Sequence, residues 1–135
     1  MVEKTFTLEE AEKLIPQLEK IVESVMENKK QAMSIGQELV ELQNRIRSGE
    51  FAANPAEIIN KQTELEFLVR IINDNLESIE NLGCQPKDLD AGLVDFPTNI
   101  EGEEVLLCWK YGEKSINFYH GLYDGFAGRK PLQKS

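Results

Sequence analysis

The sequence predicts an α+β protein in which a long antiparallel helical hairpin is followed by a small three-stranded antiparallel sheet. Apolar residues recur at steps of three and four over residues 8–46 and 58–82, which is the period of one helical face. After Gly83 the composition changes to short apolar runs separated by glycine and proline, which is typical of strands and turns. The 135 residues suit one domain, so we expect the hairpin (7–83) and the sheet with its C-terminal loop (84–135) to share one core.

The first helix has a clear start and a predicted kink. Thr7 is placed to cap the helix, and Glu10 completes a capping box three residues later. Pro16 lacks an amide hydrogen and crowds the carbonyl of Glu12, so a kink or break is expected near it. Gly49 then ends the helix.

The second helix has an equally clear start at Asn54, with Pro55 at its first position, and it stops at Gly83. The Gly49–Ala53 connection is short and the two helices have similar lengths. They are therefore expected to pack as an antiparallel hairpin.

Three strands are expected in the last third of the chain. The first runs from Leu89 to Phe96 and is closed by Pro97-Thr98-Asn99. The second is Glu103–Lys110, and the third is Ser115–His120. Short links predict an antiparallel meander, which should lie against the first helix near Leu8–Leu18, beyond the reach of the second helix.

Charge and composition exclude several classes of protein. The formal net charge is −9, from 24 acidic and 15 basic residues, so nucleic acid and anionic membrane surfaces are not expected partners. The sequence has no apolar run long enough for a transmembrane helix, and its start lacks signal-peptide features, which predicts a cytoplasmic protein. Cys84 and Cys108 lack zinc-finger spacing and are expected to be buried thiols.

The block GLVDFPTNIEGEEVLLCWKYGEKSINFYHGLYDGFAGRKPL (residues 92–132) resembles the closing signature of a family of uncharacterised bacterial and archaeal proteins, a domain of unknown function. The opening FTLEEAEKLIP is similar to the start of the same family. Tyr119 stands where that family usually has tryptophan. The resemblance implies a single domain and supplies no activity. The matching residues are Asp95, Phe96, Pro97, Leu107, Trp109, Lys110, Gly112, Glu113, His120, Gly125, Phe126, Gly128, Arg129 and Pro131.

His120 is the single histidine of the chain and the first candidate site residue. Strand alternation places it on one face with Ile116 and Phe118, where a histidine is usually a hydrogen-bonded structural residue. The functional alternative joins it to Asp124 and Asp95 as an acid–base or metal-binding cluster. One histidine with two carboxylates is a thin ligand set, so no metal is expected unless a symmetry mate adds a second histidine. No cofactor can be named.

Arg129 lies in a glycine-rich segment with Gly125 and Gly128, where converging amides and a guanidinium could bind an anion. The alternative is an ion pair of Arg129 with Asp124 or Asp95 that fastens the loop.

The aromatic residues of this region also have two interpretations. Trp109 and Phe118 are expected in the core, whereas Tyr119, Tyr123 and Phe126 belong either to the core or to a surface that binds a ligand or partner. Cys108 or Ser115 could act as a nucleophile only with His120, and strand alternation places neither beside it.

The leading prediction of function is a small binding or scaffolding module whose working surface is the His120–Arg129 loop. Apolar residues outside a narrow helical seam predict a four-helix homodimer; they are Ile21, Met26, Ile59, Phe67 and Ile71. A protein partner is possible. The alternative is a small enzyme or metalloprotein that uses His120, Asp124, Asp95 and Arg129. A structural role in a larger assembly, through the acidic hairpin, comes third.

Overall fold

The structure, a computed structural model, describes residues 4–49 and 54–133. Three helices come first in the chain: α1 (Leu8–Lys13), α2 (Ile15–Arg47) and α3 (Pro55–Asn81). Five strands follow, with a 3-10 helix before the last: β1 (Gln85–Asp88), β2 (Leu93–Ile100), β3 (Glu103–Lys110), β4 (Phe118–Gly121), η1 (Phe126–Gly128) and β5 (Lys130–Pro131). The α+β class is confirmed. The prediction of three strands is wrong, because the antiparallel sheet has five in the order β1-β2-β3-β4-β5.

The capping box at the start of α1 is present. The Thr7 hydroxyl accepts the amide hydrogen of Glu10 at 3.1 Å, and the Glu10 carboxylate accepts that of Thr7 at 2.9 Å. The helix is broken between Lys13 and Ile15, and Pro16 lies in the first turn of α2. Proline is tolerated there because the amides of a first turn have no intrahelical partner.

The ends of the hairpin helices also follow the sequence. The Asn54 side chain accepts the Ala56 amide hydrogen at 3.0 Å, and Pro55 opens α3. Gly49 and Gly83 follow the two helices with φ of 78° and 95°, the left-handed conformation that glycine adopts without steric cost. Residues 50–53 of the predicted Gly49–Ala53 connection lie outside the described residues.

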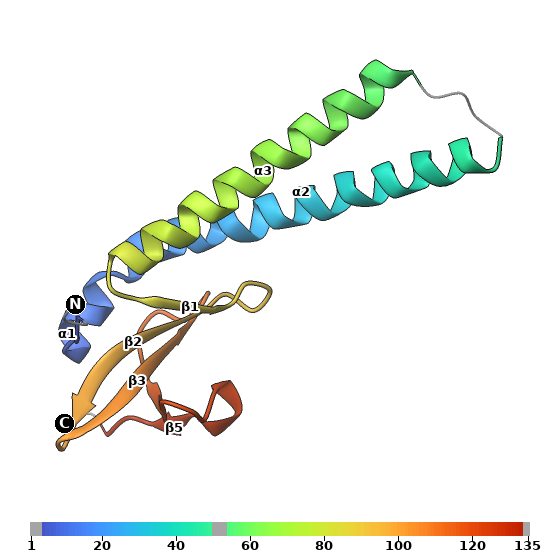
Figure 1. Cartoon of the computed structure of the whole chain (residues 1–135). Coiled ribbons are helices and arrows are strands. Elements are labelled where there is room, and N and C mark those ends of the chain that lie inside the picture. Colours follow the sequence, from blue (N-terminus) through green and yellow to red (C-terminus); the bar gives the residue numbers. More distant parts are fainter. Residues whose placement is uncertain (1–3, 50–53, 134–135) are drawn as a thin grey trace.

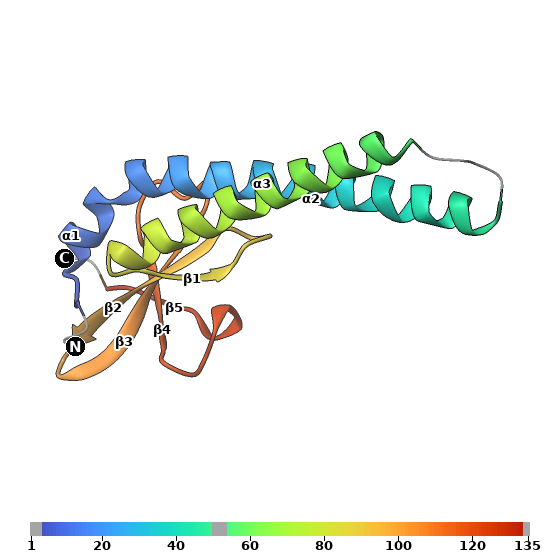
Figure 2. The ribbon, with the colours of Figure 1, turned by 45° about the horizontal axis from the view of Figure 1, so that its top comes forward.

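Helices α2 and α3 lie side by side as an antiparallel hairpin that projects well beyond the sheet (Figure 1). The sheet lies under the end of the hairpin where α2 begins and α3 ends (Figure 2). No helix among the described residues has the length and apolar character needed to cross a membrane.

The start of the sheet differs from the prediction. Residues 89–92 form a turn rather than a strand, because the Asp88 carboxylate accepts the amide hydrogens of Asp90 and Ala91 and Gly92 has φ of 69°. The predicted turn at Pro97 is instead part of β2. The Pro97 carbonyl accepts the Phe6 amide hydrogen, so the side of Pro97 that lacks a donor faces away from β3.

The turn between β2 and β3 is Glu101-Gly102, where both residues have positive φ, 52° and 82°. That pattern matches a two-residue type I′ turn, and it pairs Ile100 with Glu103. Strand β3 has the predicted bounds. The third predicted strand starts late, at Phe118, because the amide of Ile116 donates to the Glu12 carboxylate of α1 instead of joining the sheet.

The main core lies between the sheet and the near end of the helices, as the sequence predicts. It combines Ala11, Ile15, Leu18 and Val22 of α1 and α2 with Ile79 of α3 and with strand residues including Val94, Phe96, Leu107 and Trp109. Ile116 also lies here, which shows that the expected shared face of Ile116 and His120 is wrong. Thr98 fastens the N-terminal segment by donating its hydroxyl hydrogen to the Phe6 carbonyl at 2.6 Å.

The sheet also covers part of the apolar surface that suggested a dimer. Ile21 and Met26 pack against the core of their own chain, and Ile71 is partly buried. By contrast, Ile59 and Phe67 are 58% and 61% exposed. Only part of the sequence argument for self-association therefore remains.

Replacing Gly92 by alanine is expected to lower the free energy of unfolding by about 1 to 3 kcal/mol. A Cβ at Gly92 would lie 2.7 Å from the Cβ of Tyr111, and its φ of 69° is unfavourable for alanine. Urea denaturation measures the change. Gly102→Ala is the matched control, since its φ is also positive but no atom lies within 4 Å of the added Cβ. Equal losses in both variants would contradict the steric part of the argument.

Candidate functional site

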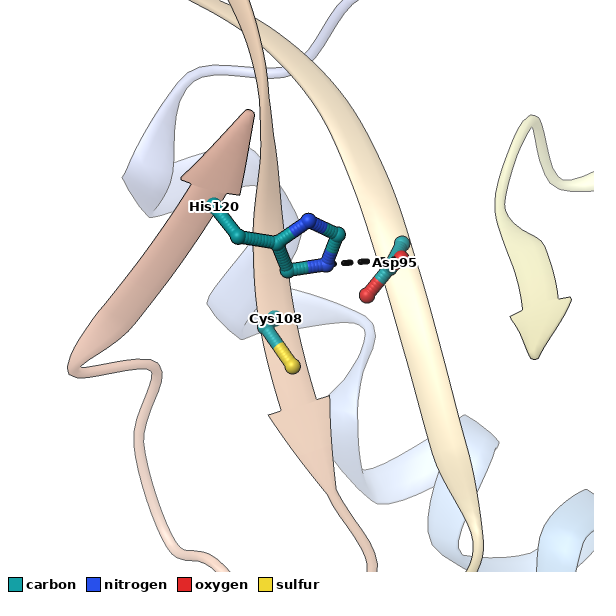
Figure 3. Close-up of side chains that lie close together, drawn as sticks. All are labelled: Asp95, Cys108 and His120. Carbon is teal, nitrogen blue, oxygen red and sulfur yellow. Dashed lines mark hydrogen bonds and ion pairs between the residues drawn. The ribbon is translucent and has the colours of Figure 1, made fainter. Parts of the chain in front are cut away.

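The register of the sheet brings two predicted site residues, Asp95 and His120, together with Cys108. Asp95 of β2 is paired with Cys108 of β3. His120 of β4 is paired with Leu106, which lies two residues before Cys108 in β3 and therefore on the same face. Side chains alternate along a strand, so Asp95, Cys108 and His120 share the face opposite the helices. Figure 3 shows these three side chains close together above adjacent strands. We call them the Asp–Cys–His cluster.

His120 and Asp95 form a buried pair. The His120 Nε2 lies 3.0 Å from the Asp95 Oδ2, and the two side chains are 4% and 2% exposed. The other ring nitrogen, Nδ1, lies 2.8 Å from the carbonyl oxygen of Gly121. A carbonyl oxygen only accepts, so Nδ1 carries a hydrogen, and Nε2 and Oδ2 share one proton between them. Burial raises the pKa of Asp95, and the neighbouring His120 opposes that rise.

Cys108 completes the cluster but is not an activated nucleophile. Burial raises the pKa of its thiol to about 12, with the Asp95 charge adding to the effect. Both nitrogens of His120 already have partners in Gly121 and Asp95. The cysteine therefore lacks the thiolate that nucleophilic catalysis needs, and His120 is not free to act as its base.

A small pocket opens above the cluster. Its volume is about 270 Å³, and its floor is the Asp–Cys–His cluster. The remaining lining residues come from strands β1 and β2 and from the C-terminal loop: Lys87, Leu93, Leu122, Tyr123, Gly125 and Phe126. We call it the sheet–loop pocket. It has a polar floor and a mostly apolar rim, an arrangement common in ligand sites.

Arg129 holds the C-terminal loop on the sheet. Its Nη2 donates to both carboxylate oxygens of Glu113 at 3.0 Å, and its guanidinium lies 4.1 Å from the Phe118 ring centroid and 4.7 Å from that of Phe126. The predicted ion pair with Asp124 or Asp95 is wrong, because the partner is Glu113. The Arg129 Nε–H is buried and has no hydrogen-bond partner among the described residues. Ring contacts and one carboxylate therefore hold the guanidinium.

Glu113 bonds to three residues, although no pattern in the sequence marks it as a site residue. Besides binding Arg129, its carboxylate accepts the Lys110 amide hydrogen at 2.7 Å, and its carbonyl accepts the Trp109 indole hydrogen at 2.9 Å. These bonds tie the β3–β4 connection to the loop. Its place in a turn beside Gly112 gave no sequence signal for a partner 16 residues away.

Asp124 does not join His120 and Asp95. It is exposed, and its carboxylate accepts the Gly121 amide hydrogen at 3.1 Å within its own turn. Any Cβ at Gly121 or Gly128 would approach Asp124 atoms to 2.6 or 2.8 Å. Gly128 therefore serves local packing. Gly125 has φ of 70° and lines the sheet–loop pocket.

The aromatic residues divide between the two faces of the sheet. Trp109 is fully buried in the helix-side core, as predicted, whereas Phe118 is partly buried under Arg129 on the other face. Tyr119 packs on the helix-side core, so it does not line the sheet–loop pocket. Tyr123 is 98% exposed and Phe126 43% exposed at the pocket rim.

A larger and more open groove of about 850 Å³ lies at the far end of the sheet. Its walls come from residues 5–8, from the β2–β3 turn and from the C-terminal segment near Leu132, and Tyr119 lines one side. Glu10 and Glu101 are its only titratable carboxylates among the described residues, and Glu10 is already engaged by Thr7. The groove therefore lacks a converging chemical group comparable with the Asp–Cys–His cluster.

Comparison with protein families agrees with the resemblance seen in the sequence. Residues 4–132 match the model of a family described as "Uncharacterized conserved protein (DUF2203)". Comparison with curated proteins and with solved structures gave no match. The matched range includes the hairpin, the sheet and the whole Asp–Cys–His cluster. The chain therefore belongs to the DUF2203 family of uncharacterised conserved proteins.

Proposed function

We propose that the protein is a binding and scaffolding module, a homodimer joined through its helical hairpin that presents the C-terminal loop as its binding surface. The observation that carries the proposal is the exposure of large apolar side chains along the part of the hairpin beyond the sheet. They are Met33, Val40, Ile46, Ile59, Phe67 and Val69, which are 42% to 61% exposed. We call them the distal apolar residues.

The hairpin has little core of its own in this region. Its buried residues there are Ile35, Leu39 and Leu68, each still 6% to 8% exposed. Helix α2 has 33 residues and is therefore about 50 Å long, and the sheet covers only one end. Two isolated helices bury a narrow seam, and a second hairpin packed alongside would form a four-helix bundle that buries more of each apolar stripe.

The C-terminal loop suits a binding role because it is fixed in place while its apolar side chains are exposed. Arg129 and Asp124 fasten it to Glu113 and Gly121. Leu122, Tyr123 and Phe126 are 42%, 98% and 43% exposed around the sheet–loop pocket. Ordered aromatic side chains are good anchors, since little conformational freedom is lost when a ligand or partner binds them.

Sedimentation equilibrium of the full chain tests the dimer. We expect twice the mass of one chain at micromolar concentration, and monomers for Met33→Glu and Val40→Glu, because each places a charge among the distal apolar residues. Ser34→Glu is the matched control. It adds the same charge to an exposed position next to Met33 but about 100° around the helix, and should remain dimeric. A monomeric wild-type protein would exclude the proposal.

A further inference from the structure

The Asp–Cys–His cluster has the composition and geometry of a transition-metal site. One ligand atom from each side chain, a carboxylate oxygen, a thiol sulfur and an imidazole nitrogen, lies within 4.8 Å of the other two. It is the single group of three such side chains found within residues 4–49 and 54–133. All three are buried, and each comes from a different strand of the same sheet.

His120 is oriented as a metal-binding histidine is. Its Nδ1–H donates to the Gly121 carbonyl at 2.8 Å, so Nε2 is the nitrogen that can bind a metal. Metal-binding histidines characteristically donate their other N–H to a backbone carbonyl or carboxylate, which fixes the ring and its tautomer. Here the fixed Nε2 points at the carboxylate of Asp95 (Figure 3).

The spacing of the ligand atoms needs little change to hold an ion. Tetrahedral zinc bonds of about 2.0 Å to oxygen and nitrogen and 2.3 Å to sulfur imply ligand atoms roughly 3.3 to 3.7 Å apart. The Nε2–Oδ2 distance of 3.0 Å would widen slightly, and the sulfur would approach from within 4.8 Å. The strands that carry the three side chains are already paired, so the backbone holds them on one face of the sheet.

The ligand types also select the ion. A thiolate and an imidazole favour Zn²⁺ and related transition metals over Mg²⁺ or Ca²⁺, which prefer oxygen ligands. Binding of a divalent ion displaces two protons to solvent, the thiol proton of Cys108 and the proton shared by the His120 Nε2 and the Asp95 Oδ2. The resulting thiolate and carboxylate balance the charge of the ion, so the occupied site would be neutral overall, which suits its burial. Only three protein ligands are present, and the fourth position would face the sheet–loop pocket.

We propose that Asp95, Cys108 and His120 bind one Zn²⁺-type transition-metal ion per chain, with a fourth coordination position open to a small ligand in the sheet–loop pocket. The site lies wholly within one chain and does not depend on the hairpin forming a dimer.

Titration of the chelator-treated full chain with Co²⁺ tests the proposal. Co²⁺ reports sulfur ligation through a thiolate-to-metal charge-transfer band in the near ultraviolet, and tetrahedral geometry through its visible bands. We expect both to saturate at one Co²⁺ per chain, to disappear on addition of Zn²⁺, and Zn²⁺ to raise the thermal midpoint.

Cys108→Ser should abolish the charge-transfer band and weaken Zn²⁺ binding more than about 100-fold, beyond the effect of losing a residue that only orients a ligand. Cys84→Ser is the matched control. Cys84 is equally buried but belongs to the helix-side core, so its loss should leave the band intact. Absence of the band in the wild-type protein would overturn the proposal, and this result does not depend on whether any variant folds. So would a band that survives in Cys108→Ser.

Discussion

Truncation of Trp109 to alanine is expected to lower the free energy of unfolding by about 3 to 5 kcal/mol, the usual cost of removing a large buried aromatic side chain. Trp109 is fully buried between the sheet and the near end of the helices. Its indole also donates to the Glu113 carbonyl at 2.9 Å, so alanine leaves both a cavity and an unpaired acceptor. Because Trp109 is the only tryptophan, denaturation should be followed by far-ultraviolet circular dichroism rather than fluorescence.

Trp109→Phe separates the two contributions. Phenylalanine keeps an aromatic ring in the core but cannot donate to the Glu113 carbonyl, so the expected loss is about 1 to 3 kcal/mol. Domains of this size are stable by only about 5 to 15 kcal/mol, so the alanine variant should unfold at a clearly lower denaturant concentration. A loss below about 1 kcal/mol for alanine would mean that the helices and the sheet do not share this core.

The helical part of the fold could be predicted because its signals are local. Thr7 with Glu10, Asn54 with Pro55, and the terminal Gly83 each act through backbone groups a few residues away. A sequence displays such contacts directly. For the same reason β3, an apolar run between two glycine turns, was predicted with its observed bounds.

The first predicted strand ends too early, at Phe96, because Pro97 reads as a terminator in the sequence but lies within β2 in the structure. Proline is excluded from a central strand position but not from a position where its missing donor faces away from the paired neighbour. Here the amide of Phe6 donates to the Pro97 carbonyl on that side, and Phe6 lies more than 90 residues away in sequence. Nothing near Pro97 could have indicated that partner.

The same error also hid part of the candidate site, because the position of the turn decides which residues of β2 and β3 lie opposite each other. Once the turn is placed at Glu101-Gly102, an antiparallel register pairs Asp95 with Cys108, so two of the three cluster residues could be predicted from the sequence. The position of His120 was not, because the β3–β4 register depends on the irregular connection before Phe118. Likewise the pair of Glu113 with Arg129 joins two loops, whose geometry no periodicity encodes.

Replacing Arg129 by alanine is expected to destabilise the protein by about 2 to 4 kcal/mol, more than an exposed ion pair would contribute. The Arg129 side chain is only 13% exposed, and that of Glu113 is 26% exposed. The variant removes the contacts with the Phe118 and Phe126 rings and leaves the Glu113 carboxylate without its cation. Urea denaturation measures the loss. Hydrogen exchange should show faster exchange at the amides of residues 122–128, since Arg129 fastens that loop.

A double-mutant cycle of Arg129→Met and Glu113→Gln separates charge pairing from packing. Methionine keeps an unbranched chain against the phenylalanine rings, and glutamine keeps an oxygen to accept the Lys110 amide hydrogen. Each single variant leaves a partly buried charge unpaired, whereas the double variant leaves none, so the double should cost less than the sum by about 1 to 3 kcal/mol. Arg129→Lys keeps the charge but lacks the planar guanidinium that lies over the rings, and should still loosen the loop. If the single losses simply add, then the ion pair contributes nothing and the loop is held by ring packing alone.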